Sequence, residues 1–217
     1  MNCGKELPED AIFCIGCGKP QQSDMSTKEE KISGKLPQES KGPAADNLKD
    51  AIDFIFEVRE YITTVSEFTS QEYTSMEKNL FKAQNLITRA QKSDPDVSVI
   101  IPGTNQLIGC NNAFALNSYT IGRLGFEALK NMEGMSKMRA ISHAQINFKE
   151  SNDLFPNPEA SFFYARALHE EYNMKKSKMM PQGKLKAKVI EAYEYVIKNW
   201  PDSEWADESR KFLAELQ

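Results

Sequence analysis

The residues best suited to carry out chemistry are three cysteines near the start of the chain: Cys3, Cys14 and Cys17. Cys14 and Cys17 are separated by two residues, a spacing that lets both thiolates reach one metal ion. Gly18 follows this pair and permits the tight turn that such a metal-binding knuckle needs. We expect the protein to occupy a reducing compartment, where paired cysteines indicate metal or redox chemistry rather than a disulfide. The spacing therefore predicts a metal site with these three cysteines as ligands.

Residues 3–18 as a whole resemble the short zinc ribbon of bacteria and archaea. In that family ten residues separate two Cys-x-x-Cys knuckles, as ten residues separate Cys3 from Cys14. Gly-Lys-Glu-Leu-Pro follows Cys3, and Phe13 precedes the complete knuckle of Cys14 and Cys17. The resemblance implies a structural zinc ion held by four thiolates in a tetrahedral shell that is closed to substrate. It also implies that the metal supplies most of the module's folding free energy, on the order of 10 kcal/mol or more.

The first cysteine of the family pattern would fall one residue before Met1, so Met1 and Asn2 occupy the spacer of the first knuckle. We hypothesise that the native chain extends upstream to a further cysteine, which would complete the four ligands. Two alternatives are open: a three-cysteine site completed by water or another group, and a degenerate module without metal. A redox role for Cys14 and Cys17 has less support, because no thioredoxin-like strand and helix follow them.

Composition divides the chain into a zinc-ribbon-like module at 1–20, a linker at 21–47 and a helical domain at 48–217. The linker has no aromatic residue and few apolar ones. It cannot bury enough apolar surface to offset its ordering entropy, and we expect it to be flexible and disordered. From Leu48 onward, apolar residues recur at three- and four-residue steps, the period of amphipathic helices. We expect no strand outside the cysteine module, and the predicted fold class is all-α.

The apolar pattern from Leu48 to Ala90 fits one long helix or, preferably, two helices folded back as a hairpin with a break near Ser70. A loop with Pro95, Pro102 and Gly103 is expected next. Further helices are predicted over the ranges 112–130, 137–154, 159–172, 185–199 and 204–216. Within the first of these, Gly122 and Gly125 are expected to be small positions where another helix approaches closely.

Two of these helices share a pattern of small and large residues that ends in a proline. The pattern consists of Ala144, Phe148, Ser151 and Pro156 in one helix, and of Val189, Tyr193, Val196 and Pro201 in the other. Both sets resemble the second helix of the tetratricopeptide repeat, a helical hairpin of about 34 residues. The closing prolines are 45 residues apart, which implies an insertion at 173–184, and residues 48–92 show no such pattern. The alternative is a generic helical bundle.

Stacked helical hairpins present a concave face that binds peptides or helices of other proteins. The resemblance implies that the helix around Tyr164, Ala165 and Leu168 lines this face. Its partner groove would then consist of Phe162, Arg166, His169 and Glu170. The alternative is that Phe162 belongs to the core and the other three lie on a solvated surface.

Net charge and missing motifs exclude several classes of function. The chain has 31 acidic and 27 basic residues, which counts against nonspecific binding to nucleic acid or anionic membranes. No secretory signal or membrane-length apolar run occurs, so we expect a cytoplasmic location and no membrane partner. His143 and His169 are the two histidines, and no catalytic or phosphate-binding motif is present, so we expect no enzyme. Cys110 is expected to be a buried thiol. The lysines between 175 and 188 are expected to form a solvated loop, and the alternative is that they contact nucleic acid or a membrane surface.

The sequence thus predicts a noncatalytic adaptor with a structural zinc ribbon and a tetratricopeptide-like helical domain that binds another protein or a peptide. The alternative is a nucleic-acid-associated zinc-ribbon protein, in which the ribbon and the lysine-rich segment contact phosphates. Salt-dependent binding to DNA or RNA separates the two, because phosphate contacts make affinity fall steeply with salt. The sequence predicts neither the identity of the partner nor the oligomeric state.

Overall fold

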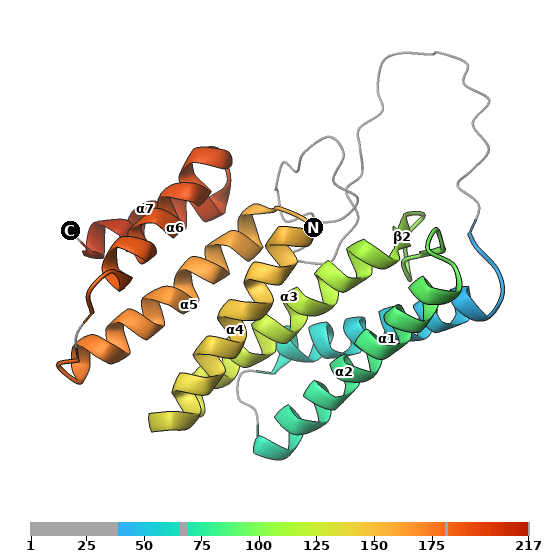
Figure 1. The fold of residues 1–217 in the computed structure, drawn as a ribbon, viewed down its shortest axis with the longest axis horizontal. Coiled ribbons are helices and arrows are strands. Elements are labelled where there is room, and N and C mark those ends of the chain that lie inside the picture. The colour runs from blue at the N-terminus through green and yellow to red at the C-terminus, as the bar shows by residue number, and fades with distance from the viewer. Residues whose placement is uncertain (1–38, 66–68, 181, 217) are drawn as a thin grey trace, which may run out of the picture.

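The computed structural model describes residues 39–65, 69–180 and 182–216. Its elements in chain order are α1 (Pro43–Thr64), α2 (Ser70–Ser93), β1 (Ser98–Ile100), β2 (Leu107–Gly109), α3 (Cys110–Ala128), the 3-10 turn η1 (Leu129–Asn131), α4 (Gly134–Leu154), α5 (Pro158–Ser177), α6 (Leu185–Asn199) and α7 (Glu204–Leu216). The helices follow one another across the molecule in sequence order, from α1 and α2 at one end to α6 and α7 at the other (Figure 1). The described residues are mostly helical, which confirms the all-α class.

The first two helices form the hairpin that the apolar pattern predicted. Thr69 caps α2, because its hydroxyl accepts a hydrogen bond from the Glu72 backbone N–H while the Glu72 carboxylate accepts one from the Thr69 N–H. This capping box explains why a new helix begins near Ser70 instead of the first one continuing. The helical region also begins earlier than the expected boundary at 48: α1 starts at Pro43, and Ala45 is 1% exposed.

A small β-hairpin shows that the expectation of no strand outside the cysteine module was wrong. β1 and β2 pair antiparallel, with Val99 opposite Ile108, and both side chains are fully buried. The segment from Val97 to Ile101 alternates buried and exposed residues, which is the period of a strand. The strands are only three residues each, so their alternation is too short to stand out among the surrounding turn residues.

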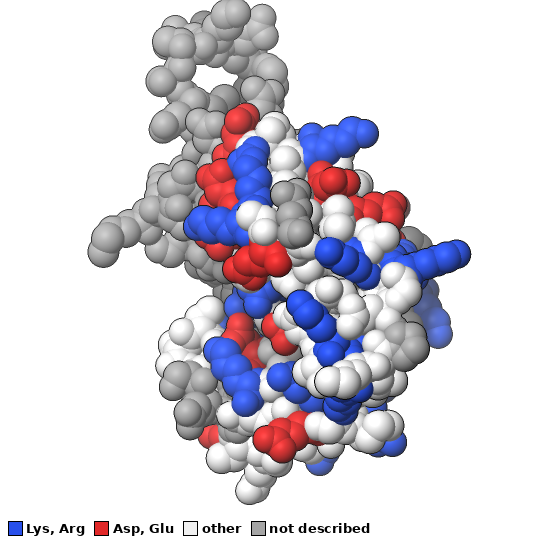
Figure 2. Space-filling model, turned by 90° about the vertical axis from the view of Figure 1, so that its left-hand side faces the viewer, with Lys and Arg blue, Asp and Glu red and all other residues white. Residues whose placement is uncertain are grey.

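Charged side chains of both signs cover the face of the molecule at the α6–α7 end (Figure 2). None of the described helices is long and apolar enough to cross a membrane. The core runs continuously beneath this surface from α1 to α7, and its largest fully buried side chains include Tyr193 and Phe148. Both residues belong to the small-and-large pattern that the sequence singled out.

The contact between α3 and α4 depends on a missing side chain. A methyl group added at Gly122 would lie 2.8 Å from the ring of Phe148, which is itself fully buried. At Gly125, three residues along the same helix, an added methyl would lie 3.9 Å from the Ala140 carbonyl oxygen, an ordinary contact. The packing of α3 against α4 therefore requires a glycine at position 122, whereas position 125 has room for a methyl group.

Gly122→Ala is expected to destabilise the protein by about 1–3 kcal/mol, because the added methyl overlaps a buried ring that has no free space to move into. Gly125→Ala is the matched control in the same helix, and its higher helix propensity is expected to leave stability unchanged or raise it by up to about 1 kcal/mol. Urea unfolding followed by circular dichroism measures both. Equal effects of the two substitutions would contradict the packing described here.

Glu72 makes the start of α2 sensitive to acid. Hydrogen bonds from Thr69 and Tyr61 to its carboxylate lower its pKa from 4.5 to about 2. A carboxylate with a lowered pKa stabilises the fold above its unfolded pKa, and this stabilisation is lost as the pH falls from about 4.5 to about 2. We expect the melting temperatures of the native protein and the Glu72→Gln variant to converge over this range. A difference that is independent of pH would contradict this role.

Candidate functional site

The predicted zinc ligands Cys3, Cys14 and Cys17 lie outside the described residues. The fourth cysteine, Cys110, is the first residue of α3 and is 3% exposed. Burial raises the pKa of its thiol, which disfavours the reactive thiolate. The expectation of a buried thiol is therefore confirmed. Within the described ranges, no three His, Cys, Asp or Glu side chains are grouped so that they could hold a metal ion.

The four residues of the predicted partner groove lie on the side of α5 that faces α7. Phe162 is 4% exposed, and its ring centre lies 4.9 Å from that of Trp205 in α7. His169 is 6% exposed, and its Nδ1 atom lies 3.1 Å from the Tyr193 hydroxyl oxygen. Burial, followed by the charge of Arg166, lowers the pKa of His169. Both residues are thus packed inside the protein, and for His169 this differs from the expected surface position.

The two charged members of the predicted groove lie at the edge of this contact. The Arg166 guanidinium lies 4.0 Å from the centre of the Phe212 ring, and it pairs with Glu170 at 3.6 Å. Their side chains are 25% and 29% exposed. Because α7 covers Phe162 and His169, a partner could reach only Arg166 and Glu170 of this set in the arrangement described. Partner binding through these residues stays a prediction.

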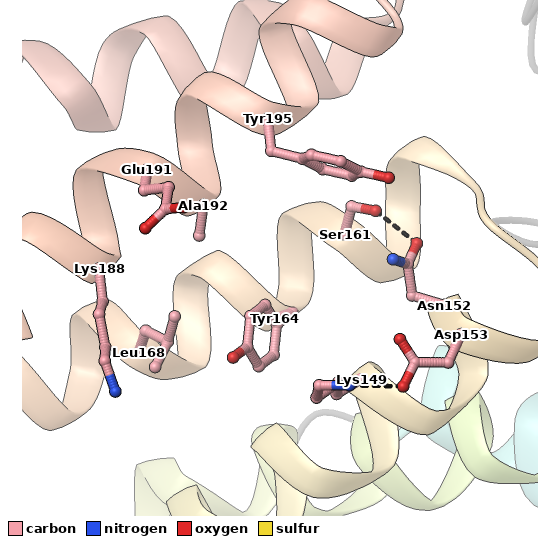
Figure 3. Close-up of a pocket in the computed structure, with 10 residues that line it drawn as sticks. All are labelled: Lys149, Asn152, Asp153, Ser161, Tyr164, Leu168, Lys188, Glu191, Ala192 and Tyr195. Atoms are coloured by element: carbon pink, nitrogen blue, oxygen red, sulfur yellow. Dashed lines mark hydrogen bonds and ion pairs between the residues drawn. The ribbon is translucent and has the colours of Figure 1, made fainter.

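A cleft opens on another side of α5, between α4, α5 and α6, with a volume of about 460 Å³ (Figure 3). Its ten lining residues come from all three helices: Lys149, Asn152 and Asp153 from α4, Ser161, Tyr164 and Leu168 from α5, and Lys188, Glu191, Ala192 and Tyr195 from α6. The small side chains of Ser161 and Ala192 leave room between longer neighbours. The cleft therefore depends on how three helices pack together. The apolar pattern of a single helix does not predict it.

The cleft combines aromatic surface with hydrogen-bonding groups. Tyr195 is 44% exposed, and its ring and that of Tyr164 both border the open space in Figure 3. Asn152 accepts a hydrogen bond from the Ser161 hydroxyl at 2.6 Å, which fixes the amide at one end of the cleft. Lys149 pairs with Asp153 at the rim, where both side chains are 60% exposed. A partly aromatic cleft with a hydrogen-bonded amide at one end is suited to binding.

The lining residues do not form a recognisable catalytic arrangement. The Ser161 hydroxyl donates to an amide oxygen and not to a base that could activate it. The two described histidines, His143 and His169, are not among the residues that line the cleft. The chemistry available at the cleft is therefore hydrogen bonding, ion pairing and apolar contact.

A buried cluster of charges holds the first turns of α5 against α3. The Arg123 guanidinium donates to the Tyr119 hydroxyl at 3.0 Å and pairs with Glu127 at 3.2 Å and Glu159 at 3.4 Å. It also lies 4.2 Å from the centre of the Phe163 ring. The Glu159 side chain is 5% exposed, so this carboxylate is buried with its partner. This cluster positions the part of α5 that carries Ser161 and Tyr164.

Comparison with known protein families gives one match. Residues 1–21 match the family model of a zinc-ribbon domain. The match confirms the zinc-ribbon resemblance of the N-terminal module and indicates zinc binding there. No curated protein and no solved structure matches the chain, and the tetratricopeptide-like resemblance of the helical domain stays a prediction.

Proposed function

We propose that the protein is a noncatalytic adaptor of the cytoplasm, in which a structural zinc ribbon is joined to a helical domain that binds a segment of another protein. The observation that carries the proposal is the cleft between α4, α5 and α6. Its volume and its two bordering tyrosines suit one or two side chains of a bound peptide. The packing of small and large residues between helices supports a tetratricopeptide-like binding domain.

The zinc ribbon contributes structure in this proposal. Cys3, Cys14 and Cys17 supply three thiolates, which is the donor type that structural zinc sites use. A closed tetrahedral site needs one more ligand than these three. With zinc bound, the ribbon is a second binding module, and joining two modules in one chain raises the effective concentration of one partner near the other.

Selection of peptides from a random display library tests the binding function of the cleft. Full-length protein with zinc is immobilised, and selected peptides are then measured against two variants. Ala192→Arg places a long side chain in the cleft and is expected to weaken binding about tenfold or more. Ala187→Arg is the matched control, because this alanine lies in the same helix, is exposed and does not line the cleft.

Two results would contradict the proposal. One is a selection that yields no peptide binding above background, and the other is equal binding of the selected peptides by Ala192→Arg and the native protein. Thermal melting of both variants checks that each is folded.

The second candidate function is nucleic-acid association. The observation that favours it is a set of six lysines between Glu171 and Glu191 with no acidic residue among them. Binding of single-stranded RNA that falls steeply with added salt would support this candidate. The cleft favours the protein-binding function, because it presents side-chain-sized space and not a basic channel.

A further inference from the structure

The turn between α5 and α6 carries a concentration of positive charge, of which only Lys188 also lines the cleft of the proposed peptide-binding function. We define the basic tip as the eight residues Lys175, Lys176, Lys178, Met179, Met180, Lys184, Lys186 and Lys188. The turn lies at the free end of the α5–α6 pair, away from α1 (Figure 1). Lys and Arg side chains gather over the lower half of the neighbouring face in Figure 2. The basic tip is therefore an exposed, strongly charged projection.

Most of this charge is not neutralised by neighbouring acids. Lys175 pairs with Glu171. Among the residues that the structure describes, the side-chain amines of Lys178, Lys184 and Lys186 have no ion-pair or hydrogen-bond partner within bonding distance. Several unpaired cations on one small projection repel one another, so the arrangement favours an external anionic surface.

Met179 gives the basic tip an apolar point. It follows the last residues of α5 with φ 54°, and its side chain is 95% exposed. Its N–H donates to the Lys176 carbonyl oxygen at 3.1 Å, and the Met180 N–H donates to that of Lys175 at 3.0 Å. This is the helix-ending turn in which glycine is the preferred residue at the left-handed position. The left-handed backbone conformation of Met179 is unfavourable for methionine. Its apolar side chain is exposed and does not pack against the protein.

A third exposed methionine, after Met179 and Met180, lies at the same end of the helices. Because α4 runs antiparallel to α5, the start of α4 lies beside the end of α5, and Met174 packs against Ala140 and Ile141 of α4. Met135 in the first turn of α4 is 66% exposed, and Lys137 and Arg139 follow it. The basic, methionine-bearing surface thus extends beyond one turn.

We infer that the basic tip docks on an anionic lipid surface, with Met179 and Met180 entering the headgroup region and the lysines contacting lipid phosphates and carboxylates. Charge complementarity and a protruding apolar point are the two features of peripheral membrane attachment. A single-stranded nucleic acid would instead favour exposed aromatic rings for stacking, and the residues of the basic tip are lysines and methionines. The acidic charge of the whole chain predicted no membrane partner, but it averages over this local concentration of lysines.

Co-sedimentation of the full-length protein with lipid vesicles tests this inference. One set of vesicles is phosphatidylcholine alone, and the other contains about 30% phosphatidylserine. We expect binding to the anionic vesicles only. Replacing Lys178, Lys184 and Lys186 together with glutamine is expected to weaken this binding about a hundredfold, since each lysine near an anionic surface contributes about fivefold. The matched control replaces the exposed Lys78, Lys82 and Lys92 of α2 with glutamine and should leave binding unchanged.

Met179→Gly separates membrane docking from a structural role. Glycine relieves the left-handed conformation, so the melting temperature is expected to rise while vesicle binding falls severalfold. Equal sedimentation with neutral and anionic vesicles would overturn the inference, as would equal losses from the two lysine triples. Salt-sensitive binding of single-stranded RNA through the same three lysines, without vesicle binding, would overturn it in favour of nucleic acid.

Discussion

Replacing Cys14 with serine is expected to abolish stable zinc binding by the N-terminal module. The substitution removes one thiolate of the complete Cys14–Cys17 knuckle, and a structural zinc site loses most of its affinity when a thiolate is lost. Metal analysis of the purified protein after dialysis against a weak chelator measures the effect. We expect zinc in the native protein and background levels in the variant.

Cys110→Ala is the matched control for this prediction. Cys110 is buried at the start of α3, within the helical part of the chain, so its loss is expected to leave the zinc content unchanged. Undiminished zinc in Cys14→Ser, or loss of zinc in Cys110→Ala, would contradict the assignment of the metal to the zinc ribbon.

Replacing Arg123 with methionine is expected to destabilise the helical domain by about 3 kcal/mol. The substitution leaves the buried Glu159 carboxylate without its cation, and breaking a buried ion pair from one side is strongly unfavourable. Methionine preserves much of the contact that the Arg123 stem makes with Phe163. Urea unfolding followed by circular dichroism gives the change in free energy of unfolding.

Two further variants test whether the lost charge pairing causes the destabilisation by Arg123→Met. Arg210→Met removes an exposed ion pair with Asp207 and is expected to change stability by less than about 1 kcal/mol. The double variant Arg123→Met, Glu159→Met is expected to recover much of the loss, because no unpaired charge is then buried. A double variant less stable than Arg123→Met would show that the cluster stabilises by packing and not by charge pairing.

The sequence predicted the helices well because each helix has its own periodic pattern of apolar residues. The apolar residues of 185–199 and 204–216 lie at helical spacing and are bounded by turn residues, and α6 and α7 have these same bounds. The buried positions Val189, Tyr193 and Val196 were likewise readable from one helix. What the sequence did not contain was the placement of one helix against another.

Sequence reasoning missed residues whose burial and contacts depend on how one helix packs against another. Glu159 looks like a solvated carboxylate at a helix start, yet α3 brings Arg123 against it and buries the pair. Phe162 and His169 were assigned to an open groove, but α7 folds back over them. The cleft arises where three helices meet, and Ser161 and Ala192 are two small lining residues from different helices.

The most direct measurement of the central claim is the set of backbone amide NMR signals that shift when a display-selected peptide is added to the full-length protein. We expect the shifts to concentrate around the cleft, at Lys149, Tyr164 and Tyr195, and the signals of α1 and α2 to stay unchanged. Shifts confined to α1 and α2, or to the α5–α7 contact around Phe162 and Trp205, would contradict it.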